Sequence, residues 1–174
     1  NNCKAIEELI TGSKNGKLMK EGIKTVILGK PNVGKSSLLN ILVKDDRAIV
    51  TDIAGTTRDT LEETIMLNDI TLNIIDTAGI RNTEDIIERI GVEKAIKLSQ
   101  DADLIIYVID SSTNLDDNDK KILNLIEDKK AILLLNKSDL TPRVTVDDIK
   151  DKSKHPIIIT SFVDYKGIEQ LEEL

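Results

Sequence analysis

The chain has 174 residues, which is enough for one globular domain with a sizeable buried core. Aromatic residues are 2% of the chain and the net charge is −7, so the composition argues against base stacking on single-stranded nucleic acid and against a direct grip on a phosphate backbone. The apolar runs, 104–109 and 131–135, are far shorter than the roughly 20 residues of a membrane-spanning helix. The single cysteine, Cys3, predicts a cytoplasmic protein without an internal disulfide.

Two regions are expected along the chain. Residues 1–22 carry a short helical pattern and a glycine-containing linker, and we interpret them as the end of a preceding helical domain. Residues 23–174 form the main domain. Because the chain begins at Asn1 and stops inside a helical pattern, we interpret it as a piece of a longer protein.

Strands and helices alternate through the main domain. Strands are expected at 24–28, 61–67, 71–75, 104–109, 131–135 and 156–160. Helices are expected at 36–43, 92–99, 119–126 and 145–150, with a further helical pattern at 167–174. This order predicts an α/β fold with a mostly parallel, six-stranded sheet flanked by helices, and with ligands at the carboxyl ends of the strands.

The segment GKPNVGKS, Gly29–Ser36, lies between an expected strand and an expected helix, which is the setting of a phosphate-binding loop. Its glycines allow backbone N–H groups to converge on phosphate oxygens at the helix N-terminus. Lys35 is expected to reach the β- and γ-phosphates, and the Ser36 hydroxyl to bind Mg²⁺. A glycine-rich turn that matches by chance is the alternative, and the flanking elements argue against it. The predicted nucleotide-binding residues of this loop are Gly29, Asn32, Val33, Gly34, Lys35, Ser36 and Ser37.

Two further motifs are placed where they can sense a γ-phosphate. Asp76, at the end of an apolar run, is expected to support Mg²⁺ through water, and the N–H of Gly79 to approach the γ-phosphate. Gly55-Thr56-Thr57 precedes them in the chain. The nucleotide-binding residues predicted here are Thr51, Asp52, Ile53, Ala54, Gly55, Thr56, Thr57, Asp76, Thr77, Ala78 and Gly79.

The segment Asn136-Lys137-Ser138-Asp139 follows a buried strand and predicts guanine recognition. The Asp139 carboxylate can accept hydrogen bonds from N1–H and the 2-amino group of guanine, whereas adenine offers neither donor and would leave the charge unpaired. The Lys137 stem can cover the base. The loop Thr160-Ser161-Phe162 is expected to complete the pocket through a backbone N–H to guanine O6, although Ala is commoner than Phe at position 162. A polar loop cap is the alternative for the tetrapeptide alone.

The position that follows the Asp76–Gly79 motif is Ile80, where many small GTPases have a Gln that orients the attacking water. A residue of the polar stretch 81–89 could supply the missing group, or a partner protein could. The candidates in this stretch are Glu84, Asp85 and Glu88, and arginine fingers could come from Arg58 or Arg81.

Four stretches together resemble the G domain of the tRNA-modification GTPase family MnmE, also called TrmE, among the TrmE, Era and Der group of GTPases. They are GKPNVGKSSLLN at 29–40, IVTDIAGTTRD at 49–59, IIDTAGIR at 74–81 and ERIGVE at 88–93. The resemblance covers essentially the whole chain and implies a Ras-like fold.

The resemblance also implies a mechanism. G domains of this family pair face to face with GTP bound, and K⁺ replaces an arginine finger. Carried over by motif, Thr57 binds Mg²⁺ beside Ser36 and Asp76, and Glu88 orients the attacking water. The implied catalytic residues are Glu88, Lys35 and Gly79, and the implied K⁺ ligands are Asn32, Thr51, Ile53 and Thr56. The full-length family protein modifies the wobble uridine of tRNA with the flavoprotein MnmG, an activity that this domain alone is not expected to have.

Three alternatives stay open at the level of the sequence. A ribosome-assembly GTPase domain of the Der or Era type shares several motifs. A binding module could use its nucleotide state only to gate a partner, with negligible catalysis. An ATP-using P-loop enzyme is the third alternative, which the Asn136–Asp139 motif argues against.

Overall fold

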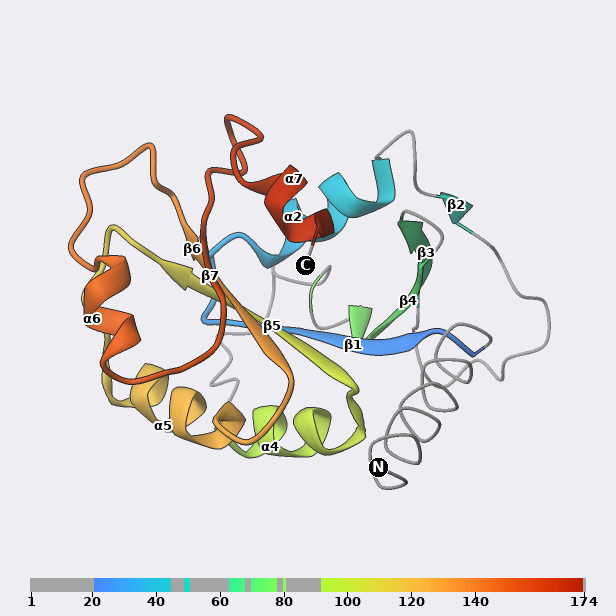
Figure 1. The fold of residues 1–174 in the computed structure, drawn as a ribbon, viewed down its shortest axis with the longest axis horizontal. Coiled ribbons are helices and arrows are strands. Elements are labelled where there is room, and N and C mark those ends of the chain that lie inside the picture. The colour runs from blue at the N-terminus through green and yellow to red at the C-terminus, as the bar shows by residue number, and fades with distance from the viewer. Residues whose placement is uncertain are drawn as a thin grey trace, which may run out of the picture.

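A computed structural model describes residues 21–44, 49–50, 63–67, 70–77, 80 and 92–173. A seven-stranded sheet with the order β2-β3-β4-β1-β5-β6-β7 forms its centre (Figure 1). The strands are β1 (Ile23–Leu28), β2 (Ile49–Val50), β3 (Glu63–Leu67), β4 (Ile70–Ile75), β5 (Leu104–Asp110), β6 (Ala131–Asn136) and β7 (Ile157–Ile159). The four pairings from β4 through β7 are parallel, and β2-β3 and β3-β4 are antiparallel.

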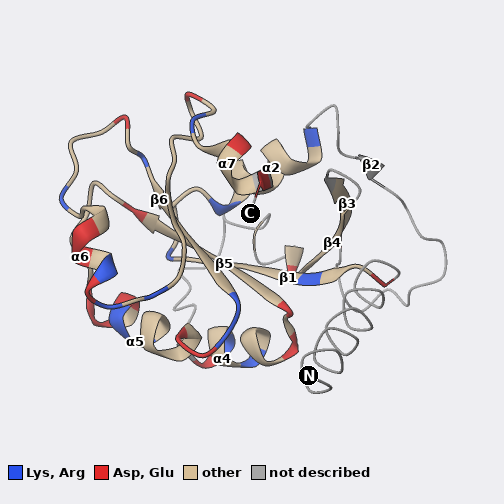
Figure 2. Cartoon of the chain, in the orientation of Figure 1, with Lys and Arg blue, Asp and Glu red and all other residues tan. Residues whose placement is uncertain are grey.

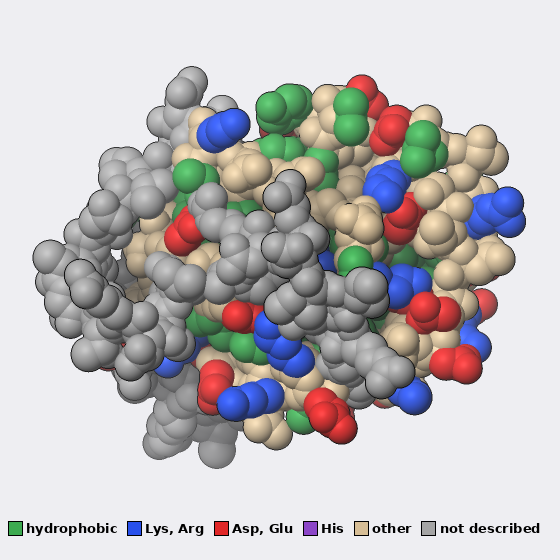
Figure 3. Space-filling model, turned by 180° about the vertical axis from the view of Figure 1, so that it is seen from behind, with side chains coloured by type: hydrophobic (Ala, Val, Ile, Leu, Met, Phe, Trp, Pro, Cys, Tyr) green, Lys and Arg blue, Asp and Glu red, His purple; other side chains and the backbone are tan. Residues whose placement is uncertain are grey.

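Helices cover both faces of the sheet, with α4, α5 and α6 on one face and α2 and α7 on the other (Figure 1). Their bounds are α2 (Lys35–Lys44), α4 (Val92–Asp101), α5 (Asp117–Ile126), α6 (Val146–Lys150) and α7 (Ile168–Glu173). Basic and acidic residues both occur on α4, α5 and α6, and the opposite side of the molecule also mixes the two signs (Figures 2 and 3). In the described part of the chain, no helix has the length and apolarity needed to cross a membrane.

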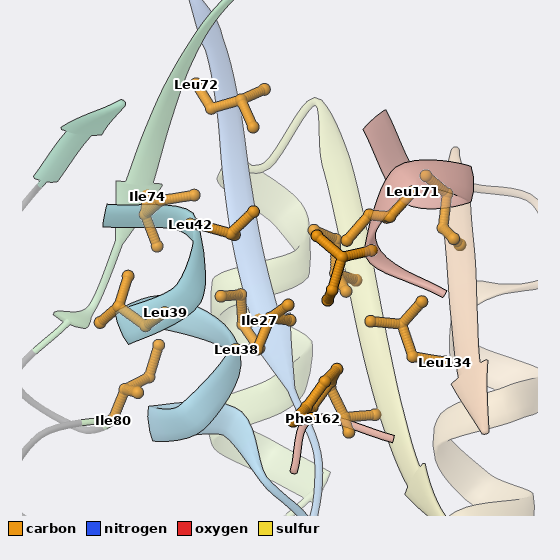
Figure 4. Close-up of a cluster of buried hydrophobic side chains, with 14 of the residues drawn as sticks. Ile27, Leu38, Leu39, Leu42, Leu72, Ile74, Ile80, Leu134, Phe162 and Leu171 are labelled. Carbon is orange, nitrogen blue, oxygen red and sulfur yellow. The ribbon is translucent and has the colours of Figure 1, made fainter. Parts of the chain in front are cut away.

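Alternation along the central strands separates two cores. In β5, Ile106 and Val108 pack in the core under α2 and α7, whereas Ile105, Tyr107 and Ile109 pack under α4, α5 and α6. Successive side chains of a strand point to opposite faces, so a run that is apolar throughout is what a sheet covered on both sides requires. Figure 4 shows the first core, in which the leucines of α2 meet the sheet and Phe162.

The predicted fold class is confirmed. All six expected strands are present within a few residues of their predicted bounds, and β2 adds a two-residue strand at the edge of the sheet. A strand this short carries almost no periodic signal in the sequence. The predicted helical segment and linker at 1–22 lie outside the described residues, except for 21 and 22.

Candidate nucleotide-binding site

The carboxyl ends of β1, β5 and β6 meet at one edge of the sheet because the three strands are parallel neighbours. Gly29 directly follows β1, and the last residues of β5 and β6, Asp110 and Asn136, are paired in register. This edge is the crevice in which open α/β sheets bind ligands. It brings together the predicted phosphate loop and the predicted guanine motif, which are about a hundred residues apart in the chain.

The predicted phosphate loop surrounds an open hollow of ≈ 280 Å³ in front of helix α2, lined by Asn32, Gly34, Lys35, Ser36 and Ser37. The Nζ of Lys35, which is 6% exposed, donates to the carbonyls of Gly29 and Lys30 at 2.8 and 2.7 Å. The first N–H groups of a helix have no carbonyl one turn earlier to bind, so α2 directs donors and the positive end of its dipole into this hollow. The hollow is therefore suited to phosphate oxygens.

Backbone strain is concentrated at the predicted motifs. Among the described residues other than glycine, positive φ occurs at Asn32 (61°), Asp76 (58°), Lys137 (63°) and Tyr165 (56°). The first three belong to the phosphate loop, to the predicted Mg²⁺ motif and to the guanine motif. Each such conformation costs about 1–3 kcal/mol and persists only where the surrounding structure enforces it, which is common at functional sites.

The Asn136 side chain joins the phosphate loop to the predicted guanine loops. Its Nδ2 donates to the Val33 carbonyl at 2.8 Å, and its Oδ1 accepts from Thr160 Oγ1 at 3.2 Å and from the Phe162 N–H at 3.3 Å. The residue is 3% exposed. A Cβ on Gly34 would lie 2.5 Å from this Nδ2, so the close approach requires glycine at position 34, where φ is also positive.

The predicted guanine-reading carboxylate is exposed and held from one side. Ser161, which is fully buried, donates its Oγ to Asp139 Oδ1 and also lies 2.9 Å from Asp164 Oδ2. Neighbouring Lys137 forms an ion pair with Asp110 at 2.6 Å. Burial opposes the charged form of Asp110, but hydrogen bonds from Lys137 and Ser112 outweigh it and hold the pKa of Asp110 below its usual value. The Lys137 stem is thereby fixed beside the loop that carries Asp139.

The residues predicted to support Mg²⁺ provide oxygen ligands of the kind that this ion prefers. Asp76 Oδ2 binds the ammonium of Lys94 on α4 at 3.0 Å, so this carboxylate already has a positively charged partner. The Ser36 hydroxyl donates to the Ile80 carbonyl at 2.5 Å, and it can rotate to present its lone pairs instead. Both groups therefore offer oxygen atoms that suit a divalent cation, and Ser36 lines the phosphate hollow.

Phe162 has a structural role that the sequence did not suggest. The side chain is 7% exposed and belongs to the core under α2 and α7, and its ring atoms lie within 2.9–3.1 Å of the Cβ position of Gly34 (Figure 4). Its N–H donates to Asn136, so a bond from this N–H to guanine O6 would require the bond to Asn136 to be given up.

Part of the predicted site cannot be placed. The predicted nucleotide-binding, metal-binding and catalytic residues that lie outside the described residues are Thr51, Asp52, Ile53, Ala54, Gly55, Thr56, Thr57, Ala78, Gly79 and Glu88. The same holds for the other candidates, Arg58, Arg81, Glu84 and Asp85. Thr77 is described and is 2% exposed.

The sequence reasoning missed the partners of the site's charged residues. Lys94 and Asp110 stand outside every motif, and nothing in their spacing indicates pairing with Asp76 and Lys137. Asp110 did carry a signal, because it ends an apolar strand at the ligand-binding edge. Ser138 Oγ, inside the guanine motif, is buried without a hydrogen-bond partner.

The phosphate hollow lies at the N-terminus of α2, and the buried Asn136 joins it to the loops around the exposed Asp139. This arrangement defines a P-loop nucleotide-binding domain of the GTPase class. Comparison with known proteins agrees. The family described as 50S ribosome-binding GTPase matches residues 24–137, and the chain belongs to this family of GTP-hydrolysing domains.

Curated relatives carry the name tRNA modification GTPase MnmE, which confirms the resemblance seen in the motifs. The protein of Lachnoclostridium phytofermentans is 57% identical over 170 residues, which are 98% of this chain and 37% of that protein. The protein of Finegoldia magna is 54% identical over 167 residues, which are 96% of this chain and 36% of that protein. The chain thus spans a little over a third of the length of these relatives.

Solved structures agree on the fold. The G domain of the T. maritima FeoB iron transporter matches with a TM-score of 0.58 and 30% identity, covering 87% of this chain and 94% of that one. Elongation factor SelB from Methanococcus maripaludis, in complex with the GTP analogue GppNHp, also has a TM-score of 0.58 and covers 87% of this chain and 32% of its own. Its 16% identity supports the fold alone.

Replacing Phe162 with Ala should lower the free energy of unfolding by about 3–5 kcal/mol, because the ring fills the core between Gly34 and the sheet. Thermal or denaturant unfolding measures this change. The exposed neighbour Val163, replaced by Ala, serves as the control and should change stability little. Equal stability of the Phe162 variant and the wild type would contradict the buried role.

Replacing Lys94 with Met should lower the Mg²⁺ concentration that supports nucleotide binding by about threefold, because the ammonium no longer competes for Asp76. Fluorescence of a labelled GDP, titrated with Mg²⁺, reports this concentration without any turnover. Lys97→Met removes an exposed charge from the same helix and is the matched control. A Lys94 variant that needs more Mg²⁺ than the wild type would contradict the competition.

Proposed function

We propose that this chain is the G domain of an MnmE-type, tRNA-modifying protein and that its GTP hydrolysis depends on Mg²⁺, is stimulated by K⁺ and is activated when two G domains pair. The observation that carries the guanine specificity is the Asn136 side chain, which holds the Asp139 loop against the phosphate loop. The two loops are then held at a fixed separation, which matches the distance between the purine edge and the phosphates of one nucleotide.

Recognition of the base rests on Asp139 and Ser161. The Ser161 hydroxyl binds Asp139 Oδ1 and fixes the carboxylate plane, so the remaining lone pairs can accept from N1–H and the 2-amino group. At the other end, Lys35 exchanges two carbonyl partners for phosphate oxygens. Because both groups are positioned before the nucleotide arrives, little ordering entropy is lost on binding.

Mg²⁺, when bound by Ser36, Thr57 and, through water, Asp76, offsets negative charge on the β- and γ-phosphates. The N–H of Gly79 would donate to the γ-phosphate. Glu88 would orient the attacking water by accepting a hydrogen bond from its O–H. These two roles come from the resemblance to the MnmE family, and both residues lie outside the described part of the chain.

K⁺, at a site formed by Asn32, Thr51, Ile53 and Thr56, would offset charge that develops near the bridging oxygen. Asn32 is the described member of this set. It is exposed, lines the phosphate hollow and has a φ of 61°. An amide oxygen here is accessible to a cation and to a second G domain facing the nucleotide.

The complete protein would carry out the tRNA chemistry. We propose a cytoplasmic protein that acts with the flavoprotein MnmG on the wobble uridine of tRNA. The name of the curated relatives supports a role in tRNA modification, and the partner and the modified base come from the resemblance to the MnmE family. This domain would contribute the GTP-driven step and no direct grip on nucleic acid, which agrees with the net charge of −7.

Replacing Asp139 with Asn should weaken GDP binding by about a hundredfold and favour xanthosine diphosphate, because the Asn amide donates to the 2-oxo group of xanthine where Asp accepts from a 2-amino group. Isothermal titration with both nucleotides measures the switch. Asp164→Asn is the control, since Asp164 contacts the same Ser161 hydroxyl without belonging to the guanine motif. Undiminished GDP affinity in the Asp139 variant would refute guanine recognition by this carboxylate.

GTP turnover should be at least about tenfold faster in KCl than in NaCl, because the developing charge is offset only by an ion of the right size. Asn32→Ala should abolish the difference, whereas Asn118→Ala, at an exposed position of α5, should preserve it. Size measurement with GDP and aluminium fluoride should show a dimer in K⁺ only. Equal rates in both salts with no dimer would contradict this mechanism.

A further inference from the structure

A partly buried charge cluster, centred on the buried Asp119, lies beside the phosphate loop and has no part in the chemistry described above. The Nζ of Lys30, the second residue of the loop, binds Asp119 Oδ2 at 2.7 Å and Asp116 Oδ2 at 3.1 Å, both at the start of α5. The Asp119 side chain is 2% exposed and also accepts from the hydroxyl of Tyr107, in the centre of β5, at 2.6 Å. The loop is thereby tied to a helix that starts 87 residues later in the chain.

The contacts of the cluster shift the pKa values of Lys30 and Tyr107. Burial lowers the pKa of Lys30, but hydrogen bonds to Asp119 and Asp116 outweigh it and raise the pKa above its ordinary value. Asp119 is the third helical residue of α5, and its Oδ2 also accepts from the N–H of the N-cap Asp116. Burial and the bond to Asp119 raise the pKa of Tyr107. A buried carboxylate with these partners would be strongly penalised if its cation were removed.

The backbone of Lys30 links this cluster to the nucleotide side of the loop. Its carbonyl accepts from Lys35 Nζ at 2.7 Å, while its side chain extends to α5. Lys30 thus contacts Lys35, the lysine that faces the phosphates, through its backbone, and it is anchored on α5 through its side chain. Gly29 and the strained Asn32, with φ of 155° and 61°, lie on either side of it.

We propose that Lys30 is a positioning residue for the nucleotide: anchored on Asp119, it holds the phosphate loop in the conformation that binds the diphosphate. The proposal rests on the proposed function, since it concerns the affinity for GDP. The ion pair between Lys30 and Asp119 sets the geometry of the phosphate loop, and the Lys30 ammonium makes no direct bond to phosphate.

Charge alone and positioning predict opposite effects for Asp119. If the two charges act only by attracting or repelling the nucleotide, Asp119→Asn removes a repelling negative charge and should tighten GDP binding. The double variant Lys30→Met/Asp119→Asn, which has the net charge of the wild type, should then return to the wild-type affinity. If the pair positions the loop, Asp119→Asn weakens binding, and the double variant stays weak because the anchor is still missing.

The experiment measures the dissociation constant of GDP by calorimetry, with Mg²⁺ present, together with the melting temperature of each variant. We expect Lys30→Met and Asp119→Asn each to weaken GDP about tenfold, the double variant to be no weaker than the weaker single variant, and Lys30→Arg to restore affinity because Arg can make the same two bonds. Lys120→Met, which removes the exposed partner of Asp117 on the same helix, is the control and should bind normally.

Asp116→Asn provides a second route if Asp119→Asn does not fold, because Asn caps a helix as well as Asp and only the charge near Lys30 is lost. It should weaken GDP in the same direction by a smaller factor. Unchanged affinity in Lys30→Met, tighter binding in either aspartate variant, or recovery in the double variant would overturn the proposal. A wild type that fails to bind GDP would instead count against the proposed function.

Discussion

The site depends on the Asn136 amide, which is the only described side chain that bonds both the phosphate loop and the loop after β7. An amide suits this place because one end donates to the Val33 carbonyl while the other accepts from two donors. Asp would lack the donor, and an apolar residue would leave the Val33 carbonyl unpaired in a buried environment, at a cost of about 1–3 kcal/mol. The parallel pairing of β5 and β6 brings Asn136 to this position. The sheet topology and the hydrogen bonds of Asn136 therefore fix the two loops together.

The lysines of the site all have internal partners: Lys35 binds carbonyls, Lys94 binds Asp76, Lys137 binds Asp110 and Lys30 binds Asp119. The pairs differ in what a nucleotide can do to them. Two carbonyls are weak competitors for an ammonium compared with a phosphate, so Lys35 can exchange these two bonds for bonds to phosphate oxygens. The pairs of Lys137 and Lys30 involve carboxylates that are 9% and 2% exposed, and water cannot replace either partner there. The exchangeable bonds of Lys35 therefore serve nucleotide binding. The ion pairs of Lys137 and Lys30 instead hold the loops of the site in place.

The sequence predicted the strands and the position of the loop between β1 and α2 well because each has a local cause: alternating or continuous apolar runs, glycines, and a helix directly after the loop. It could not predict the contacts of Lys30 with Asp119, or of Lys94 with Asp76, because single charged residues have no periodic pattern and their partners are set by the crossing of distant elements. Phe162 illustrates a further limit. Its position in a known loop drew attention to the missing Ala, whereas the reason for the ring lies in the space beside Gly34.

The core and the site are built from some of the same residues, which has a consequence for stability. Val33, Ile80 and Phe162 belong to the apolar cluster under α2 and α7, and Figure 4 labels Ile80 and Phe162 in this cluster. Val33 and Phe162 are members of predicted nucleotide motifs, and Ile80 directly follows the Asp76–Gly79 motif. Val33 is 2% exposed, although its carbonyl is bonded to Asn136. The loops can therefore hold strained φ values without a ligand, because unwinding them would expose apolar surface at about 25 cal/mol for each Å². Packing of Val33 and the hydrogen bonds of Asn136 and Lys35 therefore both stabilise the strained phosphate loop.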